Sequence, residues 1–110
     1  MRARAILERE SHILATDTSR VLARRLGLTP RALRRELSVE GLSVTAIIDE
    51  FRKEHAMNLV TDPDVPFKHI AARVGYADVT AFHRAFKRWT GSTPRRFRIS
   101  QGRSDSADAA

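Results

Sequence analysis

Apolar residues along this chain recur with the period of an α-helix, and no stretch alternates apolar and polar residues for long enough to predict a strand. The longest helical pattern lies between Val44 and Leu59, where Ile47, Ile48 and Phe51 share one face. It predicts an amphipathic helix that packs at both of its ends. Six or seven helices fit the whole pattern, so an all-α fold is expected. The expected helices cover residues 3–14, about 18–26, 30–40, 43–60, 66–74, 78–89 and 93–100.

Residues that start or end helices fall between these segments. Most of the helices are preceded by a polar residue that can cap them. The expected caps are Asp17, Thr18 or Ser19 for the second helix, followed by Thr29, Ser43, Asp78 and Thr93. Glycine ends several helices, because it adopts a positive φ at little cost. Residues 101–110 are small and polar, and we expect a disordered tail there.

The two halves of the chain contain an internal repeat. Residues 23–27 align with residues 71–75 at an offset of 48, with Ala at the start and Gly at the end of each copy. Further on, the offset is 49 and three residues align with three: Leu33, Arg35 and Leu37 with Phe82, Arg84 and Phe86. The second turn therefore contains one additional residue. The order of helix, glycine turn and helix in both copies is typical of a helix-turn-helix unit.

Positive charge is concentrated in the same two parts of the chain. The 110 residues carry a net charge of +7, with a pI of about 11.2. Residues 19–40 have a net charge of +4 and residues 67–98 of +7, whereas residues 41–66 between them have a net charge of −3. Two separate basic blocks, each containing one copy of the repeat, indicate two contact surfaces for an anionic partner.

The composition also excludes several classes of protein. The chain has no cysteine, so disulfides and thiolate chemistry are excluded. No apolar run approaches the roughly 20 residues of a membrane span, and no signal peptide is recognisable, so we expect no membrane partner. The four histidines form no i, i+4 zinc pair, and no phosphate-binding loop or nucleophile motif occurs. We therefore expect no enzyme activity, catalytic residue, metal or cofactor.

The second helix of each repeat has one apolar and one polar face. In the sixth expected helix the inward residues are Phe82, Ala85, Phe86 and Trp89, and the outward residues are Thr80, His83, Arg84 and Lys87. In the third, Leu33 and Leu37 face inward, and Arg31, Arg34, Arg35 and Ser38 face outward. Arg bonds guanine edges, Thr and His bond several base edges, and Val79 at the flank offers only contact with a thymine methyl. These faces predict double-stranded DNA as the partner.

Further basic residues flank these faces and are predicted to contact phosphates. The candidates are Arg24, Arg25, Lys87, Arg88, Arg95 and Arg96, together with the helix starts at Ser43 and Thr93. The expected core residues are Leu26, Leu33, Ile47, Phe51, Ile70, Val74, Phe82, Phe86 and Trp89.

A long spaced string of residues in the second repeat is specific to one family. The string consists of Ile70, Ala71, Val74, Gly75, Tyr76, Asp78, Phe82, Arg84, Ala85, Phe86, Lys87, Arg88, Trp89, Gly91, Pro94 and Arg98. It resembles the DNA-binding domain of the AraC/XylS family of bacterial transcription regulators. The resemblance extends back through Leu33–Leu37 and Gly41 to about Thr18, so that it covers residues 18–98.

The resemblance implies two homeodomain-like helix-turn-helix subdomains, at about 18–41 and 66–90, which enter successive major grooves. A long linker helix at about 43–60 would join them, a final helix at 93–100 would follow, and residues 1–17 would form an N-terminal helix or linker. The family's base-reading positions correspond to Arg31, Arg34 and Arg35, and to Val79, Thr80, His83 and Arg84. The residues at positions 79 and 66 depart from the family pattern, because Val79 replaces a frequent polar residue and Pro66 a frequent capping Ser or Thr.

The resemblance further implies a transcription activator that contacts RNA polymerase, in the bacterial cytoplasm at the nucleoid. It also implies a separate N-terminal effector or dimerisation domain, which these 110 residues lack. We favour a piece of a longer regulator over a stand-alone protein. The alternatives from other classes are a basic, chromosome-associated module without sequence preference, a membrane-surface protein, and an adaptor that binds only protein.

Overall fold

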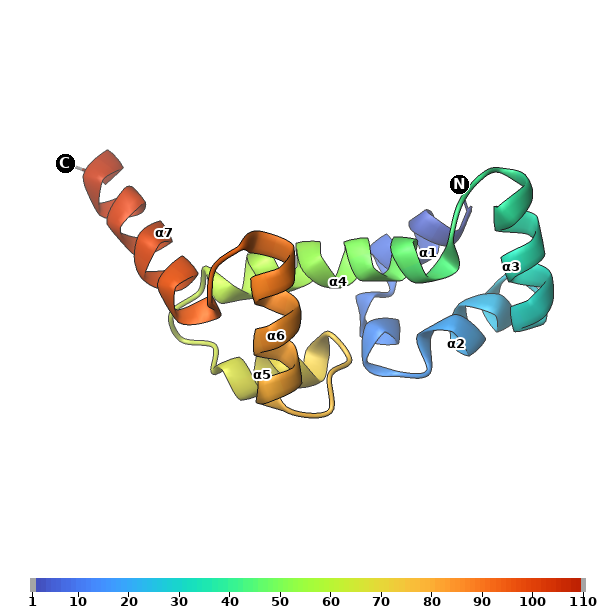
Figure 1. Ribbon diagram of the computed structural model, residues 1–110, viewed down its shortest axis with the longest axis horizontal. Helices are drawn as coiled ribbons and strands as arrows, with labels where there is room; N and C mark the ends of the chain where they lie inside the picture. Colours follow the sequence, from blue (N-terminus) through green and yellow to red (C-terminus); the bar gives the residue numbers. More distant parts are fainter. Residues whose placement is uncertain (1, 110) are drawn as a thin grey trace. The chain divides into compact units, whose positions relative to one another are not determined.

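The described part of the chain folds entirely into helices and turns. The computed structural model describes the backbone of residues 2–109 and the side chains of residues 2–101, and it contains no strand in that range (Figure 1). The helices are α1 (Arg2–Arg9), the 3-10 helix η1 (Ser11–Ala15), α2 (Thr18–Arg25), α3 (Pro30–Val39), α4 (Val44–Val60), α5 (Phe67–Arg73), α6 (Val79–Thr90) and α7 (Pro94–Ala109). The predicted all-α fold is confirmed.

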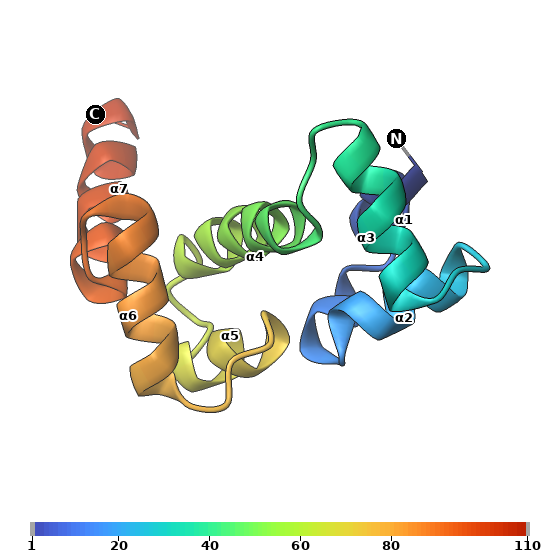
Figure 2. The same cartoon turned by 45° about the vertical axis from the view of Figure 1, so that its right-hand side comes forward.

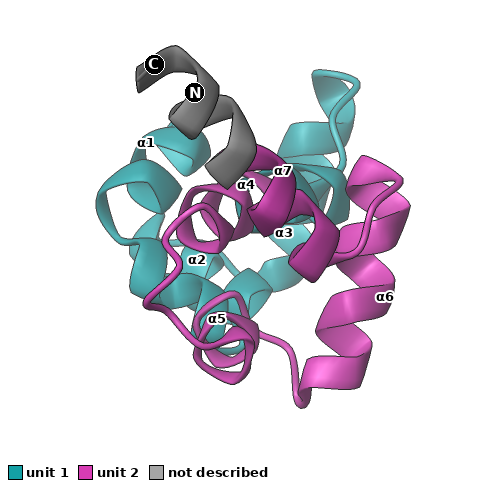
Figure 3. Ribbon diagram, turned by 90° about the vertical axis from the view of Figure 1, so that its left-hand side faces the viewer, with its two compact units in different colours: residues 1–52 teal, residues 53–110 magenta. Residues whose placement is uncertain are grey.

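The chain forms two compact units, residues 1–52 and residues 53–110 (Figure 3). The boundary falls within α4, and each part of this helix contributes to the core of its own unit. Val44, Ile47, Ile48 and Phe51 belong to the first core, and Ala56 and Val60 to the second. The prediction that this helix packs at both of its ends is therefore confirmed.

The N-terminal segment is part of the first unit's core. We expected one helix over residues 3–14, but the backbone leaves the helical region at Glu10 (φ −122°, ψ 57°) and continues as η1. The carbonyl oxygen of Ile13 accepts hydrogen bonds from the Thr16 amide (3.0 Å) and the Thr18 hydroxyl (3.2 Å), which hold the end of η1. Both parts of the segment bury apolar residues, which are Ile6 and Leu7 in α1 and Ile13 and Leu14 in η1.

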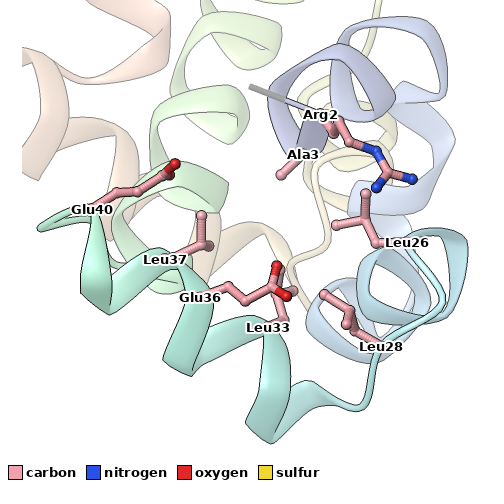
Figure 4. Close-up of a pocket in the computed structure, with 8 residues that line it drawn as sticks. All are labelled: Arg2, Ala3, Leu26, Leu28, Leu33, Glu36, Leu37 and Glu40. Atoms are coloured by element: carbon pink, nitrogen blue, oxygen red, sulfur yellow. The ribbon is translucent and has the colours of Figure 1, made fainter.

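Most of the expected core residues are buried, and two differ. Trp89 and Leu26 are only partly buried and pack against the edges of their cores. Leu26 lines an open hollow of about 320 Å³ together with Leu28, Leu33 and Leu37, so one side of it stays accessible (Figure 4). The sequence pattern identified the apolar face but not where that face ends.

The first copy of the repeat is the helix pair α2–α3. At the end of α2 the Leu28 amide donates to the Ala23 carbonyl (2.8 Å) and the Gly27 amide to the Arg24 carbonyl (3.0 Å). Gly27 has a φ of +72°, which a residue with a side chain rarely adopts. Two residues after Gly27, the Thr29 side chain accepts from the Ala32 amide and α3 begins.

The second copy of the repeat is the helix pair α5–α6 (Figure 2). Its turn has the same hydrogen bond and contains one residue more. The Tyr76 amide donates to the Ala71 carbonyl (2.9 Å), which corresponds to the first copy at an offset of 48. The next helix begins after Asp78, which accepts from the Ala81 amide (2.8 Å) at an offset of 49 from Thr29. The predicted repeat and its additional residue, Ala77, are confirmed.

Four of the expected helix caps are confirmed, whereas α2 and α5 have no side-chain cap. Ser43 accepts from the Ala46 amide and Thr93 from the Arg96 amide, as Thr29 and Asp78 do in their helices. Asp17 occupies the cap position of α2 without such a bond, and its carboxylate instead lies 3.5 Å from Nε of Arg20. Pro66 stands before α5 and, as expected, supplies no cap.

The last helix extends beyond the expected range. We expected a final helix over residues 93–100, and the bounds of α7 are Pro94–Ala109. The predicted disordered tail at residues 101–110 lies, from residue 102 onward, outside the side chains that the structure describes.

Candidate nucleic-acid interface

The outer face of α3 carries three exposed arginines. Leu33 and Leu37 anchor this helix, with only 2% and 5% of their surface exposed, and the arginines lie on the other side. They are Arg31, Arg34 and Arg35. None of the ion pairs found among the described residues involves any of the three, so their guanidinium groups are available to an anionic partner.

The outer face of α6 differs from the predicted one in a single residue. Thr80 and Arg84 are exposed, and Val79 is half-buried at the first position of the helix. His83 is also half-buried. Its ring packs edge-on against Phe67 (5.8 Å between ring centroids), and its Nε2 is enclosed without a hydrogen-bond partner. The structure therefore leaves only part of the His83 ring at the surface beside Arg84.

Most of the predicted phosphate-binding side chains are exposed. The exposed residues are Arg24, Arg25, Ser43, Lys87, Arg88, Arg95 and Arg96, whereas Thr93 is half-buried. The Ser43 and Thr93 hydroxyl oxygens accept bonds from their helix amides, so the hydroxyl protons remain available as donors. Arg25 is the exception among the cations, because its Nη2 lies 3.0 Å from the Glu10 carboxylate.

The basic residues on the second helix of each repeat thus all lack an ion-pair partner among the described residues. The ion pairs among the described residues use Arg4, Arg20, Arg25 and Arg52, and none of them lies on α3 or α6. Arg84, Lys87 and Arg88 of α6 likewise take part in no ion pair within the described range. A basic helix face without internal neutralisation suits a polyanion.

A hollow beside the start of α6 was not predicted. It has a volume of about 380 Å³ and is lined by Val79, by Ala77 of the turn, and by Lys68 and Ala72 of α5. Small apolar residues on both sides of a helix-turn-helix turn are the sequence signal that could have indicated it.

Neither a metal-binding cluster nor a membrane-spanning helix is found among the described residues. No three His, Cys, Asp or Glu residues gather in them as a metal site would require. None of the helices within that range is both long enough and apolar enough to cross a membrane.

Relatives with this sequence pattern are transcription regulators. Residues 22–100 match the family described as a helix-turn-helix domain. The HTH-type transcriptional regulator Rv1395 of Mycobacterium tuberculosis is 37% identical over 91 residues, which cover 83% of this chain and 26% of that protein. The HTH-type transcriptional regulator VqsM of Pseudomonas aeruginosa is 37% identical over 78 residues, 71% of this chain and 24% of that protein. The chain spans about a quarter of the length of these relatives.

Solved structures share the fold. The transcriptional regulator CdpR from Pseudomonas aeruginosa has a TM-score of 0.78 and 34% identity, over 89% of this chain and 30% of that chain. The C-terminal domain of AraT, a response regulator from Geobacillus stearothermophilus, has a TM-score of 0.74 and 31% identity, over 90% and 82% of the two chains. The DNA-binding domain of AdpA, solved in complex with a target DNA, has a TM-score of 0.72 over 89% and 90%; its 22% identity supports the fold alone.

The paired helix-turn-helix units and the relatives that contain them define this chain as a DNA-binding domain of a bacterial transcription regulator. Within that class the chain belongs to the AraC/XylS family, through its AraC-type helix-turn-helix domain. The relatives named above are all transcription regulators.

Proposed function

We propose that this domain binds promoter DNA sequence-specifically by inserting α3 and α6 into successive major grooves. The observation that carries the proposal is that both helices expose basic side chains, free of ion pairs within the described residues, on the face opposite their buried anchors. The side chains proposed to contact base edges are Arg31, Arg34 and Arg35 of α3, and Val79, Thr80, His83 and Arg84 of α6. Arg84 and Arg34 are suited to guanine, because a guanidinium bonds its O6 and N7 together.

The proposed phosphate contacts would hold these helices in register. They come from Arg24, Arg25, Ser43, Lys87, Arg88, Thr93, Arg95 and Arg96. The weakest member of the set is Arg25, since binding a phosphate there competes with Glu10. Phosphate contacts supply affinity and orientation, whereas base contacts supply the choice of sequence.

We further propose that the domain works within a longer transcription activator. The chain spans about a quarter of its relatives, which leaves room in such proteins for an effector or dimerisation domain. The contact with RNA polymerase and the activator role rest on the family resemblance. A regulator of this kind acts in the bacterial cytoplasm, at the nucleoid.

The substitution Arg84→Ala tests the assignment of α6 as a reading helix. We expect the free energy of binding to a cognate site to weaken by about 1–3 kcal/mol, with a smaller loss on random duplex and relaxed preference at one base pair. The matched control is Arg88→Ala, a proposed phosphate contact on the same helix, which should weaken binding to all duplexes alike. Titration of both variants against cognate and random DNA at one stated salt concentration measures the difference.

The same titrations test the non-specific alternative. Unpaired arginines also suit a module that binds any duplex with a strong salt dependence. Equal losses for Arg84→Ala on cognate and random DNA would assign Arg84 to the phosphates. The absence of any difference between duplexes for the unsubstituted protein would favour the chromosome-associated alternative.

A further inference from the structure

The hollow beside the first turn of α6 has apolar walls. Val79 forms one side, Ala77 of the preceding turn and Ala72 of α5 form others, and the volume is about 380 Å³. Tyr76 also lines the hollow, and its ring packs on Phe82 at 6.2 Å between centroids, which ties this wall to the core. An open, apolar recess of this size has room for the edge of a planar ring.

The polar groups at the rim restrict what can enter. Asp78 is committed to the helix start, because its Oδ1 accepts from the Ala81 amide at 2.8 Å. Lys68 lines the same hollow and is exposed, and no ion pair of the described residues involves it. An apolar recess with a cation at its edge suits a ligand that joins an apolar group to an anion, as a thymidine nucleotide does.

The location of the hollow leads to the same ligand. It adjoins the N-terminal turn of α6, and in helix-turn-helix domains the N-terminal residues of the reading helix contact base edges. Thymine alone among the four bases presents a methyl group in the major groove. We propose that this hollow receives the 5-methyl group of a thymine, so that Val79, Ala77 and Ala72 determine specificity at one base pair, with Lys68 beside the phosphate of the same strand. This inference rests on the proposed function and adds the identity of one base to it.

The deletion of single methyl groups from the DNA tests the inference. Binding sites are first selected from random duplex with the full 110-residue chain, and each thymine of the α6 half-site is then replaced by deoxyuridine, which changes nothing but the methyl. We expect one replacement to raise the Kd about fourfold and the others to change it less than twofold. A fourfold change corresponds to about 0.8 kcal/mol, the free energy of burying one methyl or methylene group.

Variants of the protein connect that thymine to the hollow. In Val79→Ala, and in Val79→Asn, which is close to valine in volume but polar and without a methyl group, the effect of deoxyuridine at that position should shrink below twofold. Arg34→Ala on the other reading helix is the matched control, which should lower affinity and keep the fourfold effect. Thermal melts establish which variants are folded, and Val79→Asn preserves the test if Val79→Ala does not fold.

The outcomes separate this inference from the proposed function. A selected α6 half-site without a thymine, or one in which no deoxyuridine replacement changes the Kd, overturns the thymine assignment and leaves sequence-specific binding intact. The assignment is also overturned by a fourfold effect that persists in both Val79 variants. A failure to select any site overturns both proposals together.

Discussion

Individual side chains on α6 differ in how much of them can reach a partner. Arg84 is exposed and takes part in no ion pair among the described residues, whereas His83, the preceding residue, packs against the rings of Phe67 and Phe82. The helical wheel places both on the outer face, and the difference arises from Phe67, which lies on another helix. Exposure thus makes Arg84 the stronger candidate for reading a base.

His55 should make the stability of the second unit depend on pH. Its burial, and secondarily the nearby positive charge of Arg73, lower its pKa from 6.5. The unfolded chain then binds the proton more readily than the folded one. The contribution of neutral His55 to stability is therefore complete above about pH 6.5 and is lost as the pH decreases toward the folded-state pKa. We expect the Tm of His55→Gln to fall less than that of the unsubstituted protein when the pH is lowered from about 7 to about 5.

The exposed His69 offers the control for this measurement. His69→Gln makes the same exchange of an imidazole for an amide at an exposed position, so it controls for the substitution itself. An unchanged slope in His55→Gln would show that other groups cause the loss of stability in acid.

Phe86 and Trp89 should differ in the cost of their removal. Phe86 is fully buried, with 0% of its surface exposed, and its ring contacts those of Phe82 and Phe97. We expect Phe86→Ala to reduce the free energy of unfolding by about 3–5 kcal/mol, and Trp89→Ala by less, because part of the indole is accessible. Chemical denaturation of both variants measures the two losses, and equal losses would contradict the ranking.

At the scale of whole elements, Arg98 ties α7 to the rest of its unit. Its Nε donates to the Val60 carbonyl (2.8 Å) and its Nη2 to the Val65 carbonyl (2.7 Å), and its guanidinium lies 4.2 Å from the centre of the Phe67 ring. These bonds connect the last helix to the end of α4 and to the loop before α5. One side chain therefore fixes three segments of the second unit.

The substitution Arg98→Met should destabilise the protein because it leaves two carbonyl groups without their donor. We expect a loss of about 1–3 kcal/mol in the free energy of unfolding. Arg96→Met, at an exposed position on the same helix, should change stability by less than about 0.5 kcal/mol. Denaturation of the two variants in parallel measures the difference, and a silent Arg98→Met would mean that α7 docks through its apolar residues alone.

Local signals in the sequence predicted most elements and failed where distant residues decide. The glycine turns and the caps Thr29 and Asp78 depend on neighbouring residues, so the repeat could be found from the sequence. The break at Glu10 could not, because the buried apolar residues continue on both sides of it, from Leu7 to Ile13. The partial burial of His83 could not be predicted either, because the ring that covers it, Phe67, lies on another helix.

The whole molecule consists of two units that repeat one motif, each with its own core and its own basic helix face. The candidate surfaces could be predicted in outline, because charge and the repeat coincide in the sequence. Which of the exposed residues contact bases and which contact phosphates depends on the geometry of bound DNA, and these assignments stay predictions. A domain with two reading helices should recognise a bipartite site.

The most direct test of this account is the selection of binding sites from random duplex DNA by the whole chain, at about 0.15 M salt, because affinity for DNA has meaning only at a stated ionic strength. We expect enrichment of a motif with two blocks whose centres lie about one helical turn, or about 34 Å, apart. Binding without enrichment of any sequence would contradict sequence-specific recognition, and a motif confined to one block would mean that only one of the two helices reads DNA.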